Sequence, residues 1–530
     1  MRSARIWDFT ILSSAIAFGC GSGSTARPTD GGNDGTTGAI DGGEDDGTTS
    51  ALDGATPGDG PDTLSNDASP GDAAGTSDAS MAAAPALVQH VSGSSTRNNN
   101  FASPYCYYFQ LPGGTTAGNS VVVGFTFNGN PTPTVTDDKG DSYAVEENTY
   151  DTADTQSVGI AAAFGVAAGA RVISLCFSAD PGGYVQPMAT EFAGVTAVDG
   201  AGVGSHGTGT TATAGSMTPI ASGDLVVQVV ASLGLKQSSF TAGSIGGDTA
   251  HLLSADLMDG WAGQYGIGNS TSAITPSMGM GTSDKWVSAA ILLKAGASGG
   301  VPTGKRIVHL VHENVPYNPP AGGTGNPFPS PLALQFPCSG NLLVAMEGGG
   351  NAPETVTSMS DTNHDTWSQA GKTYAQGDAV VQAFYAASAA SSEDLGLSVN
   401  WSGTKGDYTF FLYDVAGADS SPLDTTVGGG GSMGTAGSLT FPFTLTPAAP
   451  GEIVFSEVMW DFNTGSGLTG QLFDTNTFSG ESQSGPEPVD ENNGWGHVIA
   501  TTTQPVGFTW TVLFAGLPVG SWAGMAAAFK

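Results

Sequence analysis

Basic residues are scarce in this chain. Lys and Arg total 14 against 48 Asp and Glu, which gives a formal net charge of −34 at pH 7 over 530 residues. Nucleic acids and anionic membrane surfaces bind proteins through positive patches. The shortage of such residues therefore predicts that the protein binds no nucleic acid.

Cysteine and long apolar runs are also scarce. The chain has 4 Cys, and beyond its first 20 residues no apolar run approaches the roughly 20 residues of a membrane-spanning helix. Charged residues make up only 12% of the chain, whereas Gly reaches 80 residues. This balance is typical of turn-rich exported β proteins.

The first 20 residues have the pattern of an export signal. Arg2 and Arg5 supply positive charge, Phe9–Phe18 is a short, mostly apolar run, and Cys20 closes the segment. It resembles a bacterial lipoprotein signal, in which the cysteine becomes the lipidated first residue. The resemblance implies a signal peptide over 1–19, a membrane anchor at Cys20 and, since the next residue is not Asp, sorting to the outer membrane or cell surface. The alternative is an ordinary secreted protein cleaved nearby.

Residues 20–84 have a composition that disfavours folding. They are mostly Gly, Ser, Thr, Ala, Pro and Asp, with Arg27 as the only base. Such a segment cannot bury enough apolar surface to offset the entropy of ordering. It is expected to be a disordered acidic stalk.

The rest of the chain carries one β-rich unit twice. Three pairs of segments match: Thr134–Thr136 with Thr355–Thr357, Pro219–Leu225 with Pro447–Ile453, and Trp286–Lys294 with Trp522–Lys530. Their offsets rise along the chain (355 − 134 = 221, 447 − 219 = 228, 522 − 286 = 236), so the second copy has gained short insertions, which surface loops tolerate. We expect repeat one over 85–295, a linker over 296–304 and repeat two over 305–530.

Strand patterns fill both repeats. Short alternating or wholly apolar runs such as Ser120–Phe127 and Leu225–Ala231 are bounded by Gly, Pro, Asn and Asp. No segment sustains a capped apolar stripe of helical period. The pattern predicts an all-β protein with two tandem antiparallel β-sandwiches, jelly-roll-like or immunoglobulin-like, that superpose strand for strand.

The cysteines of repeat one have no counterparts in repeat two. Cys106 and Cys176 lie in strand-like stretches, and Pro331 and Asn400 stand near the matching places. Joint loss predicts a Cys106–Cys176 disulfide, which an exported protein permits. The alternative is two separately buried thiols. Cys338 is then left as a buried thiol.

Two motifs look like chemistry but favour plain structure. Gly430–Gly434 has the spacing of an esterase nucleophile elbow, yet a Gly run precedes it and a strand-like run follows, so a loop is expected. His309–Glu313 looks like a rearranged zinc motif. In a strand, however, its two His would point to opposite faces.

Asp361, Asn363 and Asp365 place oxygen atoms at alternate positions, as calcium-binding loops do. The central Gly and the distal Glu of the helix-flanked calcium motif are missing. The corresponding stretch of repeat one, Asp137–Tyr143, is typical of a hairpin turn. A turn is therefore favoured, with weak Ca²⁺ binding as the alternative, and no other cofactor is expected.

The segment Phe473–His497 differs most between the repeats. Aromatic faces beside amides and carboxylates suit sugar binding, so the ligand-binding candidates are Asp490, Asn493, Trp495 and His497. A mobile acidic loop is the favoured alternative for this segment. Separately, Gly494-Trp495 matches Gly260-Trp261, and such shared pairs are more typical of a common core.

Acid chemistry has little support in the sequence. Glu191 and Asp414 correspond (414 − 191 = 223), each inside an apolar strand, but one carboxylate per repeat is not the pair that glycoside hydrolysis needs. The sequence therefore favours a non-catalytic surface lipoprotein that binds or adheres to extracellular material, glycan or protein. The alternatives are a structural envelope component without a small ligand and, less favoured, a secreted polysaccharide hydrolase.

Overall fold

The computed structural model describes residues 84–93, 96–97, 105–182, 184–234, 237–315, 334–350, 355–402, 407–432, 438–462, 472–474, 493–513 and 520–530. Every helix or strand in these ranges is a β-strand, which confirms the all-β prediction. Within the same ranges no helix is long and apolar enough to cross a membrane. Cys20 and all but the last residue of the expected stalk lie outside them.

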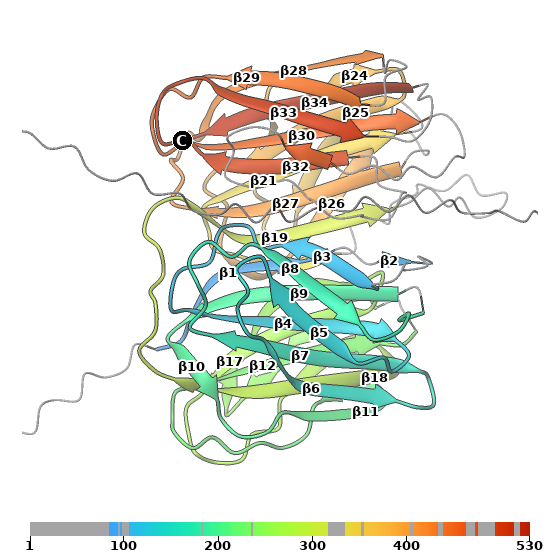
Figure 1. Cartoon of the computed structure of the whole chain (residues 1–530), viewed down its shortest axis with the longest axis vertical. Helices are drawn as coiled ribbons and strands as arrows, with labels where there is room; N and C mark the ends of the chain where they lie inside the picture. The colour runs from blue at the N-terminus through green and yellow to red at the C-terminus, as the bar shows by residue number, and fades with distance from the viewer. Residues whose placement is uncertain are drawn as a thin grey trace, which may run out of the picture. The chain divides into compact units, whose positions relative to one another are not determined.

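The largest sheet contains strands of both repeats (Figure 1). Its path is β23 (Trp367–Gln369), β25 (Ala379–Ala386), β21 (Leu342–Gly350), β27 (Asp407–Ala416), β19 (Arg306–Val315), β1 (Ala86–Ser92), β9 (Tyr184–Ala193), β4 (Ser120–Asn128), β7 (Gln156–Phe164) and β6 (Ala144–Asp151), with β2 (Thr96–Arg97) on β9 and β24 (Tyr374–Gln376) on β25. From the centre outward, β1, β9, β4 and β7 follow one another as β19, β27, β21 and β25 do. The two halves of this central sheet thus repeat one strand order on either side of a seam.

The seam is formed by β1 and β19, which pair in parallel with His90 opposite His309 and Val91 opposite Leu310. Matching Val88 with Val308 (308 − 88 = 220) makes His309 the counterpart of Gln89. Each residue of β1 therefore pairs with a residue of β19 that lies one position before its own counterpart. A shift of one residue turns a side chain to the other face of a sheet. Corresponding surfaces of the two repeats therefore face opposite sides of the central sheet.

A second large sheet also passes from one repeat to the other. Its path is β10 (Val195–Val198), β18 (Ser277–Ala295), β12 (Asp224–Ser232), β17 (Trp261–Gly268), β16 (His251–Asp256), β20 (Leu334–Cys338), β26 (Ser392–Trp401) and β22 (Val356–Asp361), with β11 (Val203–Thr213) and β13 (Phe240–Ala242) on β18. The repeats join where Ala255 of β16 pairs with Gln335 of β20.

Four smaller sheets complete the described structure. They are β3 (Cys106–Gln110), β8 (Val172–Phe177) and β5 (Pro133–Asp137); β28 (Leu423–Ser432), β34 (Gly520–Phe529), β30 (Ile453–Phe462) and β32 (Asn493–Ile499); β29 (Ser438–Leu445), β33 (Val506–Leu513) and β31 (Leu472–Asp474); and the hairpin of β14 (Ser244–Ile245) and β15 (Asp248–Thr249).

Apolar side chains cover both faces of the central sheet. On one face a single core runs through both repeats and joins residues such as Phe109 and Leu175 to Phe455 and Met525. On the other face the second large sheet packs through one core in each repeat. Burial on both faces explains why the central strands are apolar throughout and not alternating.

The sequence predicted two sandwiches joined by a short linker, whereas the structure shares two sheets between them. The physical reason is that an unpaired strand edge exposes N–H and C=O groups, and β1 with β19 and β16 with β20 pair those edges. Residues 76–530 form one compact unit, and the boundary at 296–304 stays a prediction.

The glycine run near residue 430 is a strand, so the predicted loop was wrong for residues 430–432. Gly431 pairs with Trp522 and Ser432 with Ser521 across β28 and β34. A Cβ atom on Gly431 would lie 2.9 Å from the indole Nε1 of Trp522, so the close approach of the ring requires glycine. Met433 and Gly434 lie outside the described residues.

Candidate functional site

The seam between the repeats holds two buried histidines. The rings of His90 and His309 are 6.1 Å apart, centroid to centroid. His90 Nδ1 lies 2.8 Å from Thr190 Oγ1 and His90 Nε2 lies 2.9 Å from Ser254 Oγ. Burial, and to a smaller extent the charge of His309, holds the pKa of His90 well below its usual range. His90 is therefore a neutral, hydrogen-bonded part of the core at physiological pH.

The matched carboxylates Glu191 and Asp414 lie on either side of the seam. Glu191 accepts hydrogen bonds from Gln89 Nε2 at 2.6 Å and Asn119 Nδ2 at 2.6 Å. Each carboxylate is fully buried. Because their oxygens are taken by donors of their own repeat, neither has the character of a free acid in a cleft.

Asp414 has a similar set of donors. It lies 3.0 Å from His309 Nδ1 and accepts hydrogen bonds from the backbone N–H of Ser339 at 2.9 Å and from its hydroxyl at 2.8 Å. His309 stands where repeat one has Gln89, so the two repeats hold the same buried carboxylate with different side chains.

Repeat two also buries two carboxyl groups that have no such donors. Glu347 of β21 and Glu457 of β30 are fully buried, and none of their side-chain oxygens has a hydrogen-bond partner among the described residues. Burial raises the pKa of Glu347 well above its usual range. Burial, and then the charge of Glu347, does the same to the pKa of Glu457. Both groups therefore hold their protons to a higher pH than an exposed glutamate does.

Glu457 packs against glycine and aromatic residues. A Cβ atom on Gly348 would lie 2.7 Å from Glu457 Oε1, so the absence of a side chain there makes room for the carboxyl group. On its own sheet Glu457 pairs with Trp495 of β32. The Trp495 ring lies 4.6 Å from the ring of Phe411, centroid to centroid.

His312 completes this cluster. Its ring stacks on Phe411 at 4.3 Å between centroids and lies 5.9 Å from Trp495. Burial lowers the pKa of His312 to about 3. His312, Phe411, Glu457 and Trp495, here called the repeat-two cluster, lie on one face of the central sheet, whereas Glu347, which pairs with Phe410, lies on the other face.

Repeat one has apolar residues at the positions of both glutamates. Phe125 corresponds to Glu347 (347 − 125 = 222, the offset of Gly118-Asn119 and Gly340-Asn341), and Val229 corresponds to Glu457 (457 − 229 = 228). Phe125 and Val229 are fully buried. The strand arrangement therefore does not require carboxyl groups at these positions.

Sequence reasoning missed the two glutamates, although the sequence held a signal for them. Each lies inside an apolar strand, and its counterpart in the other repeat is apolar. Comparing the repeats position by position along Leu342–Gly350 and Ile453–Phe462 would have singled them out.

The predicted ligand-binding residues do not form a surface platform. Trp495 is 6% exposed and His497 is 7% exposed, because both lie on the inward face of β32. His497 is packed against Phe455 at 5.7 Å between ring centroids. This corrects the expectation that these two rings meet a ligand at the surface. Asp490 and the side chain of Asn493 lie outside the described residues.

The carboxylates of the suggested calcium loop are used within a turn. Asp361 accepts hydrogen bonds from the backbone N–H of Asp365 at 3.1 Å and from Trp367 Nε1 at 2.6 Å. Asp365 accepts one from the backbone N–H of Ala390 at 2.9 Å. Asn363 Nδ2 donates to the Ala390 carbonyl at 2.9 Å. Among the described residues there is no group of three or more His, Cys, Asp or Glu that could hold a metal.

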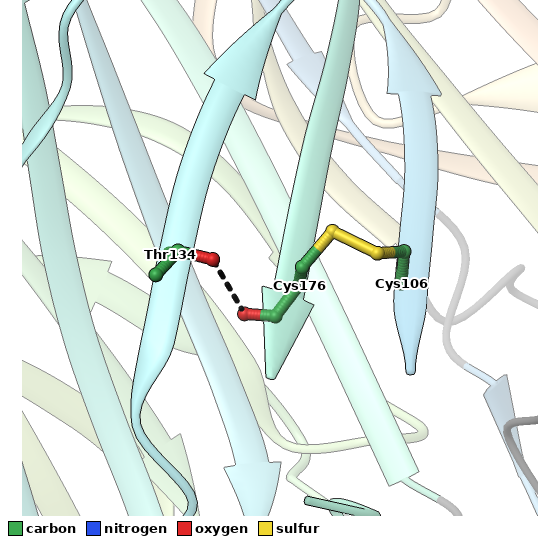
Figure 2. Close-up of a disulfide and its surroundings, with 3 residues drawn as sticks. All are labelled: Cys106, Thr134 and Cys176. Carbon is green, nitrogen blue, oxygen red and sulfur yellow. Dashed lines mark hydrogen bonds between the residues drawn. A yellow bond between two sulfur atoms is a disulfide. The ribbon is translucent and has the colours of Figure 1, made fainter. Parts of the chain in front are cut away.

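Cys106 and Cys176 form a disulfide between β3 and β8, with an S–S distance of 2.01 Å (Figure 2). On the other side of β8, Thr134 Oγ1 donates to the Cys176 carbonyl at 3.4 Å. In repeat two Thr357 Oγ1 donates to the Asn400 carbonyl at 3.0 Å. The two repeats thus keep a hydrogen bond from a threonine hydroxyl to this carbonyl where the disulfide itself is not repeated.

Cys338, the third cysteine among the described residues, is buried and forms no disulfide. Its thiol donates to the Ala390 carbonyl at 2.8 Å. Burial, and to a smaller extent the charge of Asp414, raises the pKa of Cys338 to about 12. A thiol with such a pKa is a poor nucleophile at neutral pH.

Comparison with known protein families, with curated proteins and with solved structures found no match to this chain.

Proposed function

We propose that the protein is a non-catalytic, lipid-anchored surface protein that binds or adheres to extracellular material, with glycan as the favoured class of ligand. Cys20 is the proposed anchor, residues 20–84 the spacer, and the two repeats the part presented outside the membrane. The acidic side chains described above favour a binding role over hydrolysis, because they are internal.

The observation that carries this proposal is the place where the spacer enters the fold. Residue 84 leads directly into β1, which lies at the centre of the central sheet between β9 and β19. Backbone hydrogen bonds run across strands, so tension along β1 would strain the bonds to both neighbours together and not one after another. Such an attachment suits a protein that is held at one end and bound at the other.

An uncharged polar face on repeat two suits sugar hydroxyls. Thr357 and Ser358 of β22 and Asn400 of β26 are exposed, and Asn400 Nδ2 donates to Ser358 Oγ at 2.9 Å. Hydroxyl and amide groups of this kind supply the directional contacts of ligand sites. We place the proposed contact on this face, in place of Trp495 and His497.

The test of binding uses the full chain with Cys20→Ser, purified in soluble form and applied to an array of glycans and extracellular proteins. We expect binding to a class of glycan, and we expect Asn400→Ala to weaken it while Thr271→Ala, an exposed substitution in repeat one, leaves it unchanged. Binding to none of the arrayed materials would contradict the proposal. In the cells that naturally produce the protein, the wild-type chain should fractionate with membranes and the Cys20→Ser chain should not.

A further inference from the structure

Each repeat places a lysine beside a pair of acids at corresponding positions. In repeat two Lys530 Nζ lies 3.2 Å from Asp424 Oδ1, and the side chain of Asp424 is hydrogen-bonded to that of Glu452. The lysine and Glu452 belong to the segments that match best between the repeats, Trp522–Lys530 and Pro447–Ile453. The fold and the proposed binding role leave this group unexplained.

Repeat one has the same group. Lys294 Nζ lies 4.0 Å from Asp199 Oδ1, and the Asp199 side chain is hydrogen-bonded to that of Asp224. Asp224 corresponds to Glu452 (452 − 224 = 228) and Lys294 to Lys530 (530 − 294 = 236). Three side chains have thus been kept together in both repeats while core positions such as Val229 and Glu457 diverged.

The aspartates are held by a backbone donor on the oxygen that does not face the lysine. Asp424 Oδ2 accepts a hydrogen bond from the N–H of Ala448 at 3.0 Å, and Asp199 Oδ2 accepts one from the N–H of Ile220 at 2.6 Å. A fixed N–H at this place stabilises negative charge that develops on a carboxyl oxygen under nucleophilic attack.

The second acid of each group is placed to hold a proton. Glu452 is 1% exposed, and no N–H or O–H group of the described residues donates to its Oε2, which leaves a shared proton as the link to Asp424. Burial, and then the charge of Asp424, raises the pKa of Glu452. Burial likewise raises the pKa of Asp224. Each therefore serves as a proton donor and acceptor next to the aspartate.

We propose that Lys530 and Asp424 form an intramolecular amide bond, and that Lys294 and Asp199 form its counterpart in repeat one. The lysine ammonium first gives a proton to the aspartate carboxylate, and the resulting amine attacks Cγ. The new C–N bond forms as one C–O bond breaks, and Glu452 or Asp224 passes a proton to the departing oxygen. The ammonium and the carboxylate become an amide and one water, so no oxidant, reductant or co-reactant is needed.

The fold supplies the driving force for this condensation. Amide formation from free groups is unfavourable in water, but groups fixed in contact within one molecule reach effective molarities of about 10⁵–10⁸ M. The Asp199 side chain is fully buried and that of Asp424 is 11% exposed, which protects the product from hydrolysis. The side chain of Lys530 is 40% exposed, so the released water has a route to solvent.

Mass spectrometry of the full chain with Cys20→Ser tests the proposal, because each bond removes one water and links two peptides. We expect a reduced and denatured chain lighter than its sequence mass by two waters, and branched peptides joining Asp424 to Lys530 and Asp199 to Lys294 in a protease digest. A chain of full sequence mass with only linear peptides would overturn the proposal. Loss of one water would overturn it for the repeat whose peptides are linear.

Two variants separate the bond from an ordinary ion pair. Lys530→Arg keeps the charge but cannot form the amide. The mass of this variant should therefore fall short of its sequence mass by one water and not two, and the branched peptide of repeat two alone should be absent. Glu452→Gln should keep the ion pair and slow bond formation by about 10²–10⁴-fold. Lys372→Arg, outside both groups, should change nothing. The outcome is independent of whether the protein binds glycan.

Discussion

Repeat one and repeat two use one strand arrangement with different cores. Where repeat one packs Val229 of β12 against Gly124 of β4, repeat two packs Glu457 of β30 against Gly348 of β21. Both side chains are fully buried. In both repeats a glycine of the facing strand makes room for this side chain, and in repeat two burial favours the protonated form of the acid.

The strongest way to break this comparison is to move the acid into repeat one. Val229→Glu should lower the free energy of unfolding by about 3 to 5 kcal/mol at neutral pH, because a carboxyl group without a partner replaces a close-packed methyl group. Urea denaturation followed by tryptophan fluorescence measures the change, and Val229→Met, which adds volume without charge, is the control. If the two substitutions lower stability equally, burial of the acid is not the cause.

The reverse exchange should sharpen the comparison with a smaller effect. Glu347→Phe with Glu457→Val gives repeat two the residues of repeat one, and it should raise the free energy of unfolding by about 1 to 3 kcal/mol at pH 7. Failure to stabilise at any pH would mean that the larger Phe side chain does not fit.

The gain should depend on pH, with a sign that follows from the raised pKa of both acids. Above the usual glutamate pKa of about 4.3 the unfolded chain loses protons that the folded chain retains, so the stability of the wild type falls as pH rises. Subtracting the pH profile of the double variant isolates this term. Asp394→Asn, which alters an exposed acid of the same repeat, should leave the profile nearly unchanged.

The smallest effect is expected at the seam. His309→Gln gives repeat two the residue of repeat one, and the new amide can donate to Asp414 as Gln89 donates to Glu191 at 2.6 Å. We expect the free energy of unfolding to change by less than about 1 kcal/mol, whereas His309→Leu should lower it by about 1 to 3 kcal/mol, since Asp414 then loses a donor. Equal effects of both variants would show that hydrogen bonding to Asp414 does not matter here.

Local sequence patterns predicted the strands better than their partners. Runs such as Ser120–Phe127 and Leu225–Ala231 show their strand character in composition and length. The parallel pair of β1 and β19 could not be predicted, because pairing between segments more than 200 residues apart depends on shape and not on local periodicity. For the same reason the burial of Trp495 beside Phe411 was missed.

Glycine misled the prediction around residue 430. Four consecutive glycines have low strand propensity, yet Gly428–Gly431 pair with β34. The rings of Tyr374 and Trp522 lie where side chains on Gly428 and Gly431 would be. The two buried glutamates, Glu347 and Glu457, were missed for a different reason. A carboxyl group inside an apolar strand is normally taken as outward-facing, and only its counterpart in the other repeat indicates otherwise.

The parallel seam also bears on the history of the chain. The pairing of β1 with β19 is offset by one residue between the repeats, since Val91 lies opposite Leu310 and not opposite its counterpart Val311. An exact two-fold axis would require Val311 to lie opposite His90, whereas His309 lies there, so two separate identical copies could not meet in this way and close. Two repeats of one chain can keep such an unsymmetrical contact, because each needs to fit only its own side of the seam. Within one chain the two repeats need not have identical sequences, which allowed the corresponding positions Val229 and Glu457 to become different.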